Sequence, residues 1–251
     1  MSKSVVAIVL AAGAGNRMGP DTNKIFLPVG GKALLAWSIE LFESLAEVDE
    51  VVVVAAPHEL DQCSGRVLED IQPRKVRSLI PGGPTRHQSE YHGLKAIEAE
   101  VDSGAIEIVL VHDAARPFAP AGLVRELIAG ARKNGSAVPA VPAGPHAVLA
   151  TSDRAVSEQP TDLWIAQTPQ AFRARPLLDA HRQAAREGFT GSDTSSVLEH
   201  VGREVRVVMG SYDNIKLTTP DDLLRAEQIA RHRAAHPSGE PPMLKAVTHS
   251  A

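Results

Sequence analysis

The amino-acid sequence predicts an α/β protein built on an open, doubly wound, mostly parallel sheet. Short apolar runs rich in β-branched residues recur along the chain, and segments with helical spacing separate them. Strands that alternate with helices in this way pair in parallel. Several of the runs end in loops of glycine and polar residues, and ligands of such sheets bind at the carboxyl ends of the strands.

Six segments are predicted to form strands. The first, "VVAIVLAA", is apolar throughout, as expected for a strand buried on both faces. The segment 106–117 ends in a polar loop, and the segment 136–143 contains Pro139 and Pro142. Proline cannot donate to a sheet, so these two residues should keep that strand out of a fully paired position. The predicted strands are residues 5–12, 51–56, 76–83, 106–117, 136–143 and 205–210.

Seven segments have the spacing of amphipathic helices. Gly135 is a typical stop for the fourth helix. Ser192 is the expected N-cap of the sixth helix. Thr219 is the expected N-cap of the seventh, with Pro220 in its first turn. The predicted helices are residues 33–45, 58–71, 85–101, 121–135, 174–188, 192–202 and 219–235.

Two regions interrupt this alternation. Residues 143–166 carry scattered short β-like runs and are expected to form a protruding hairpin arm. Residues 236–251 are rich in proline, glycine and serine without periodicity, which predicts a disordered tail. The remainder, residues 1–235, is expected to form one domain that includes the arm.

Composition excludes several classes of protein. The net charge of -4 argues against a general nucleic-acid coating protein, which would be basic. A single cysteine, Cys63, cannot form an internal disulfide and gives no support to an oxidising compartment. No apolar run approaches the roughly 20 residues that cross a bilayer. A cytoplasmic protein with no nucleic-acid or membrane partner is therefore expected.

The loop "VLAAGAGNRMGPDTNK" after the first strand is the strongest local signal. Its Gly13, Gly15 and Gly19 give a G-x-G-x-x-x-G spacing, one residue longer than the dinucleotide fingerprint. The second strand has no acidic residue at its tip, and a Walker A loop is absent. The pattern favours a loop whose N–H groups wrap a triphosphate while Arg17 and Lys24 neutralise it. The alternative is a tight turn with two solvated cations.

Other strand ends also carry polar residues. Asp113, followed by Arg116, is placed where a carboxylate suits Mg²⁺ beside substrate phosphates, although an aspartate in a turn is the alternative. Gly82 and Gly83 would let the backbone approach a base or a phosphate, or simply form a strand-to-helix turn. Lys216 follows the last strand, where a lone lysine is usually solvated.

Taken together, these motifs resemble one known family. "AAGAGNRMG" with Lys24, "GGPTRHQS", "VHDAARPF", "LWIAQTPQAF", "SDTSSVLEHVG" and "DNIKLTTPDDL" are similar to motifs of the 2-C-methyl-D-erythritol 4-phosphate cytidylyltransferases, in the same order. The resemblance implies a Rossmann-like nucleotidyltransferase fold. It also implies that CTP and a polyol phosphate give a CDP-polyol and pyrophosphate, with Mg²⁺, in a homodimer whose arm reaches the partner's site.

The resemblance also assigns roles to residues. It implies that Arg17 and Lys24 stabilise the transition state, Lys216 holds the acceptor phosphate, and Asp113 holds Mg²⁺. Further positions would bind the nucleotide or the acceptor. The triphosphate cradle is Ala11, Ala12, Gly13 and Gly15; Gly83 and Ser89 lie near cytosine and ribose; Arg116 and Thr168 support the acceptor, with Thr168 acting across the dimer as one option.

The chain departs from the family pattern beside Lys24 and, more seriously, on the acceptor side. Asn23 stands where the family has proline before the lysine. Gly144 and Pro145 stand where the family has an Asp-Thr pair, and the family's arm arginine has no clear counterpart. The expected acceptor is methylerythritol phosphate. Another polyol phosphate, such as ribitol 5-phosphate, and a nucleotide-binding regulator without turnover are the alternatives.

Overall fold

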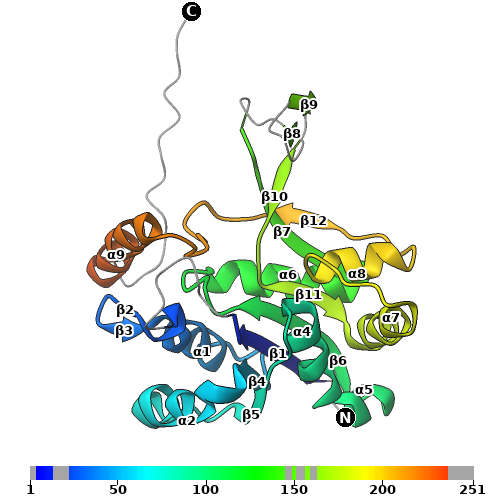
Figure 1. The fold of residues 1–251 in the computed structure, drawn as a ribbon, viewed down its shortest axis with the longest axis horizontal. Helices are drawn as coiled ribbons and strands as arrows, with labels where there is room; N and C mark the ends of the chain where they lie inside the picture. The colour runs from blue at the N-terminus through cyan, green and yellow to red at the C-terminus, as the bar shows by residue number, and fades with distance from the viewer. Residues whose placement is uncertain (1–3, 14–22, 145–148, 151–155, 159–162, 237–251) are drawn as a thin grey trace, which may run out of the picture.

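The computed structural model describes residues 4–13, 23–144, 149–150, 156–158 and 163–236. Its central sheet has the strand order β10-β7-β11-β6-β1-β4-β5, with β12 also paired to β7 (Figure 1). The strands are β1 (Ser4–Ala11), β4 (Glu50–Ala55), β5 (Val76–Pro81), β6 (Ile106–Asp113), β7 (Ser136–Pro142), β10 (Trp164–Ala166), β11 (Gln170–Arg173) and β12 (Val207–Met209).

The predicted parallel pairing is confirmed for the first half of the chain. β1 pairs in parallel with β4 and with β6, and β4 pairs in parallel with β5. β10 and β11 were not predicted as strands, and both run antiparallel to their neighbours. β11 fills the position between β6 and β7, so it joins the parallel half of the sheet to the strands that lead into the arm.

Helices cover both faces of the sheet, as expected for a doubly wound fold (Figure 1). One face carries α1 (Leu34–Ser44), α2 (Leu60–Cys63), α3 (Glu69–Ile71) and α6 (Ala121–Asn134). The other carries α4 (Arg86–Lys95), α5 (Glu98–Asp102), α7 (Ala174–Glu187) and α8 (Thr194–His200). The last helix, α9 (Pro220–Ala235), packs beside the hairpin of β2 (Pro28–Val29) and β3 (Lys32–Ala33).

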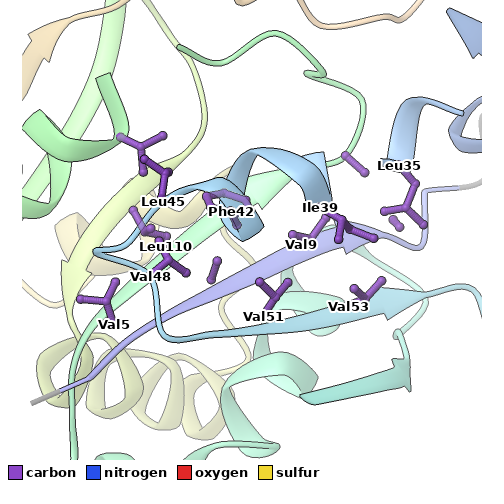
Figure 2. Packing of buried hydrophobic residues seen from close by; sticks show 14 of the residues in the cluster. Val5, Val9, Leu35, Ile39, Phe42, Leu45, Val48, Val51, Val53 and Leu110 are labelled. Atoms are coloured by element: carbon purple, nitrogen blue, oxygen red, sulfur yellow. The ribbon is translucent and has the colours of Figure 1, made fainter. Parts of the chain in front are cut away.

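The alternation of side chains along β1 divides the core into two layers. Val5, Ala7, Val9 and Ala11 belong to the cluster that packs under α1 and α6. The residues between them point to the opposite cluster. Figure 2 shows the first cluster, in which Val9 and its neighbours on β4 face apolar side chains of α1. Burial on both sides explains why the sequence of this strand is apolar without interruption.

The proline expectation for β7 is wrong, because β7 has partners on both sides. Gln167 N donates to the carbonyl of Pro139 at 2.7 Å, so Pro139 still accepts a hydrogen bond there. Proline has no N–H, and the nitrogen of Pro139 faces the gap between the end of β10 and the start of β11, where β7 has no strand partner on that side. Pro142 lies beyond the end of β12, whose last residue, Met209, pairs with Ala140. Both prolines therefore stand where no partner strand needs a donor.

Several helix boundaries differ from the prediction. The segment 85–101 forms two helices, because the fully buried Ile97 adopts φ −122° and ψ 12° between them. The N-cap of α8 is Asp193, whose carboxylate accepts from Ser196 N at 3.0 Å, and not Ser192. Thr219 is confirmed as the N-cap of α9.

Short helical turns make up the remaining irregular segments. The predicted helix over 58–71 consists of α2 and α3 joined by a π-helical stretch, Ser64–Leu68, after a 3₁₀ turn, Pro57–Glu59. A second 3₁₀ turn, Lys24–Phe26, precedes β2. The strand predicted over 205–210 is limited to β12.

The predicted arm begins where β7 and β10 leave the sheet. Two short strands, β8 (Leu149–Ala150) and β9 (Val156–Glu158), pair antiparallel and project away from the rest of the molecule (Figure 1). Of the predicted tail, residues 236–251, only His236 is described, as the C-cap of α9, and residues 237–251 lie outside the described residues. Among the described helices, none combines the length and apolar character that crossing a membrane requires.

The burial of Cys63 gives a test of this packing. Cys63 is fully buried in α2, and burial, with the nearby charge of Glu59, raises the pKa of its thiol to about 12. Because the thiolate is the reactive form, we expect Ellman's reagent to modify the native protein about 10³-fold more slowly than the guanidinium-unfolded chain at mildly alkaline pH. Absorbance of the released thiol measures both rates. Comparable rates would contradict the packing of α2.

Candidate active site

A cavity of about 400 Å³ opens at the carboxyl ends of β1, β5 and β6. The order of these strands brings together residues that are far apart in the sequence, at the edge where open α/β sheets bind their ligands. The predicted site residues in its wall are Ala11, Ala12, Gly13, Lys24, Gly83, Ser89, Asp113 and Lys216. Residues in the wall without a predicted role are Leu10, Ile25, Pro84, Thr85, Arg86, Ala115 and Thr218.

The first wall is the end of β1 and the 3₁₀ turn that follows the glycine-rich loop. The side chain of Asn23 donates to the carbonyl of Gly13 at 3.0 Å and to the carboxylate of Glu59 at 2.8 Å. Asn23 also caps the turn by accepting from Ile25 N at 3.3 Å. Lys24, on this turn, donates from Nζ to the carbonyl of Leu217 at 3.0 Å. Gly15 and Arg17 lie outside the described residues.

The second wall is the turn between β5 and α4. A Cβ at Gly82 would lie 2.5 Å from Cβ of Ala12, so only glycine allows this turn to lie against the end of β1. Ser89 Oγ accepts from Gly83 N at 3.1 Å and lies 2.9 Å from the carbonyl of Thr85, to which it donates. Ser89 therefore fixes the shape of the turn. The N-terminus of α4 meets the cavity here and favours an anionic ligand.

The floor of the cavity is a carboxylate held between two cations. Arg86 Nε donates to Asp113 Oδ1 at 2.9 Å, and Lys216 Nζ donates to Asp113 Oδ2 at 2.6 Å. Burial by itself would raise the pKa of Asp113, but the charges and hydrogen bonds of Arg86 and Lys216 hold it well below its ordinary value. Asp113 is therefore ionised at neutral pH and orients both cations.

A buried polar cluster supports Asp113 from behind. Asp113 N donates to Thr168 Oγ1 at 3.0 Å, and the same oxygen lies 3.3 Å from His112 Nδ1. His112 Nε2 lies 3.2 Å from Ser38 Oγ. Burial lowers the pKa of His112 to about 4, so its ring is neutral at physiological pH. Thr168 therefore lies behind the wall of the cavity and contacts the backbone of the residue that forms its floor.

Arg116, also predicted to bind the acceptor, lies outside the described wall. Its guanidinium donates to the carbonyls of Asn214 at 2.8 Å and of Ala166 at 3.3 Å. Burial lowers the pKa of Arg116. In this arrangement Arg116 ties the base of the arm to the loop that carries Lys216.

Arg86 is the main polar residue of the floor that had no predicted role. Its signal in the sequence was its place in "GGPTRHQS", in the first turn of a helix that follows a glycine pair. That pattern favours a cation near a ligand, but it does not predict a pairing with Asp113, which lies 27 residues further along the chain. The pairing depends on the register between β5, β1 and β6.

The residues present offer one ligand to a metal ion. Within the described part of the chain, Asp113 is the only carboxylate in the cavity wall, and no cluster of three His, Cys, Asp or Glu side chains is suited to a metal. Both of its oxygens already accept from cations, although each retains a further lone pair. Asp113 thus fits Mg²⁺ only as a single ligand beside phosphate oxygens and water.

The fold and this cavity define an α/β enzyme of the nucleotidyltransferase class. The family model "2-C-methyl-D-erythritol 4-phosphate cytidylyltransferase" matches residues 5–232. A protein of that name from Geobacter metallireducens is 40% identical over 232 residues, covering 92% of this chain and 99% of the relative. One from Geotalea uraniireducens is 41% identical over 228 residues, covering 90% and 97%.

Solved structures agree with these relatives. The Thermus thermophilus structure of 2-C-methyl-D-erythritol 4-phosphate cytidylyltransferase matches with a TM-score of 0.67 and 32% identity, over 92% of this chain and all of that one. The Anaerococcus prevotii 4-diphosphocytidyl-2C-methyl-D-erythritol synthase matches with a TM-score of 0.77 and 29% identity, over 91% and 96%. The chain belongs to the 2-C-methyl-D-erythritol 4-phosphate cytidylyltransferase family.

Proposed function

We propose that this enzyme joins CTP and 2-C-methyl-D-erythritol 4-phosphate, giving CDP-methylerythritol and pyrophosphate in isoprenoid precursor synthesis. The observation that carries the proposal is the cavity at the carboxyl ends of the strands, where Arg86 and Lys216 flank one ionised carboxylate and Lys24 lies in the same wall. Such a wall suits two phosphorylated reactants. Membership of the family supplies the identity of both.

The reaction is a nucleotidyl transfer. An oxygen of the acceptor phosphate attacks the α-phosphorus of CTP, a new P–O bond forms, and the bond to the β-phosphate oxygen breaks. Pyrophosphate leaves with the electron pair. This step needs positioning and stabilisation of negative charge more than covalent help.

The roles of the residues follow from where charge develops. The backbone of Ala11, Ala12 and Gly13, with Gly15 by resemblance, cradles the triphosphate. Lys24, with Arg17 by resemblance, stabilises charge on the reacting phosphoryl oxygens.

The other wall and the floor serve the base and the acceptor. Gly83 and the turn shaped by Ser89 lie beside the base and ribose. Lys216 carries the acceptor phosphate. Arg116 and Thr168 support the acceptor side by bracing the loops and the strand end that hold Lys216 and Asp113.

The acceptor is tested by turnover of CTP with a panel of polyol phosphates, read as pyrophosphate release. We expect methylerythritol phosphate to be the best substrate. The Asp-Thr pair and the arm arginine of the family pattern have no clear counterpart in this chain. Each lost charge-assisted hydrogen bond should weaken binding of the acceptor by about 1.5–3 kcal/mol. The KM for methylerythritol phosphate should therefore be higher than that of a relative with the full pattern. Restoring the aspartate of the family pattern by Gly144→Asp would strain the backbone, because Gly144 has φ +91°. Turnover only with ribitol 5-phosphate would reject the proposed acceptor.

Substitution of the cations near the triphosphate tests their role. Lys24→Ala and Arg17→Ala should each lower kcat by about 10²-fold or more, because each removes a charge from the developing transition state. Circular dichroism and thermal unfolding check that the fold is intact. Lys133→Ala, on the solvent-exposed last turn of α6, is the matched control and should retain full activity. Activity within threefold of the parent for Lys24→Ala or Arg17→Ala would contradict the assignment.

Mg²⁺ is the proposed cofactor, held by the phosphates of CTP with Asp113 as the protein ligand. When bound, the ion would neutralise phosphate charge and orient the leaving group. Asp113 also orients Arg86 and Lys216, so a loss of activity in Asp113→Asn would not by itself identify a ligand.

The dependence on metal concentration separates these two roles. Activity should be lost with EDTA and restored by Mg²⁺. In Asp113→Asn, we expect lower kcat and a higher Mg²⁺ concentration for half-maximal rate, because an amide is a poorer ligand than a carboxylate. An unchanged Mg²⁺ requirement at reduced kcat would assign Asp113 to positioning alone.

We also propose a cytoplasmic homodimer, formed through the base of the arm. Large apolar side chains are exposed at this edge: Trp164 at 43%, Ile165 at 53%, Val207 at 57% and Met209 at 57%. β10 and β12 flank β7, and alternation along the strands gives Trp164, Val207 and Met209 the same face. A cluster of this kind favours a protein interface. The buried free thiol of Cys63 suits a reducing compartment.

Light scattering coupled to gel filtration tests the dimer. The parent should elute with twice the chain mass, and Trp164→Glu should shift the equilibrium toward the monomer by placing a charge in the interface. Leu224→Glu, on exposed α9, is the matched control and should leave the mass unchanged. A monomeric parent at micromolar concentration would contradict the proposal.

A further inference from the structure

Behind the cavity, α4 carries a buried carboxylate that has no place in the reaction described above. Glu90 is fully buried and is absent from the cavity wall. Its Oε2 accepts from Arg86 Nη1 at 2.9 Å and from Thr194 Oγ1 at 2.9 Å. Its Oε1 lies 2.8 Å from Nε2 of His181. A buried carboxylate carries a large desolvation cost unless cations and donors offset it, and these three partners do so.

Glu90 is the rear end of a row of alternating charges. Arg86 uses Nη1 for Glu90 and Nε for Asp113, and Asp113 uses its second oxygen for Lys216. The row therefore begins at Glu90, whose other partners lie on helices α7 and α8, and ends at the ammonium group of Lys216 in the cavity wall. Burial by itself would raise the pKa of Glu90, but His181 and Arg86 lower it on balance.

The geometry of the guanidinium gives Glu90 a directional effect. A guanidinium is a rigid planar fork, so two carboxylates on different nitrogens fix its orientation. Arg86 Nη2 is buried and has no hydrogen-bond partner among the described residues. Without the charge of Glu90, the guanidinium of Arg86 can turn and donate two hydrogen bonds to Asp113. It would then compete with Lys216 for the same carboxylate.

We infer that Glu90 is a positioning residue for the transfer reaction. It holds Arg86 so that this side chain takes one oxygen of Asp113 and leaves the other to Lys216. This inference rests on the proposed function for its kinetic consequence, but its structural consequence can be measured without turnover.

Glu90→Gln tests the inference, because the amide keeps the size of the side chain and removes its charge. By analogy with outer-shell residues of metal sites, kcat should fall by about 10-fold or more. The Kd for CTP, measured by calorimetry, should change less than about threefold, because the backbone cradle does not contact Glu90. A kcat within twofold of the parent would overturn the inference.

Thr194→Val is the matched control. It removes a buried donor to the same carboxylate oxygen and should lower thermal stability, but it keeps the charge of Glu90 and its pairing with Arg86. We expect kcat to stay within twofold of the parent. If Thr194→Val and Glu90→Gln lower kcat equally, Glu90 serves the stability of the network and the inference is wrong.

A double-mutant cycle tests the route through Arg86. In an Arg86→Gln background, Glu90→Gln should change kcat by less than about twofold, since the group it orients is already gone. An undiminished effect in that background would show that Glu90 acts by another route and would overturn the inference.

A crystal structure of Glu90→Gln provides the readout that does not depend on activity. We expect Arg86 to turn toward Asp113 and Lys216 Nζ to move out of hydrogen-bond distance of Oδ2. Unchanged contacts of 2.9 Å and 2.6 Å would overturn the inference whatever the substrate. An inactive parent with the expected movement would instead reject the proposed function alone.

Discussion

The burial of β1 on both faces and along both edges is the constraint on which the rest of the structure depends. β4 and β6 both pair with it in parallel. Parallel pairing brings the carboxyl ends of the strands to one edge of the sheet, so β1, β5 and β6 all end at the cavity. Leu10 is in register with Asp113, which sets the carboxyl end of β1 beside the carboxylate.

The electrostatics of the site follow from this placement. A carboxylate at the end of a buried strand needs cationic partners. Arg86 at the start of α4 and Lys216 in the segment before α9 supply them. The same pairings fix the positions of the cations before any ligand binds. Preorganised charge of this kind favours transfer between phosphates because it needs little rearrangement as charge develops.

Local patterns predicted much of the fold because each reports on burial of a short segment. The uninterrupted apolar run of β1 and the threonine-proline start of α9 were both interpreted correctly. β11 was missed because its four residues are too few to show a period, and its strand conformation comes from pairing with β6 and β7. The break at Ile97 was missed because Ile97 is apolar and buried, as the helical pattern requires, and nothing in the local sequence marks its non-helical backbone.

The sequence by itself determined the class of fold and singled out Lys24, Asp113 and Lys216, which the structure places in the wall of one cavity. These features are local, because spacing and residue type within one segment are enough to show them. Only the tertiary structure decided that Arg86 lies between Asp113 and Glu90, and that Thr168 supports the strand end from behind the cavity. Asp113 and Lys216 are 103 residues apart, and their contact depends on strand order and register. Those are set by packing of the whole core, which no single segment of the sequence encodes.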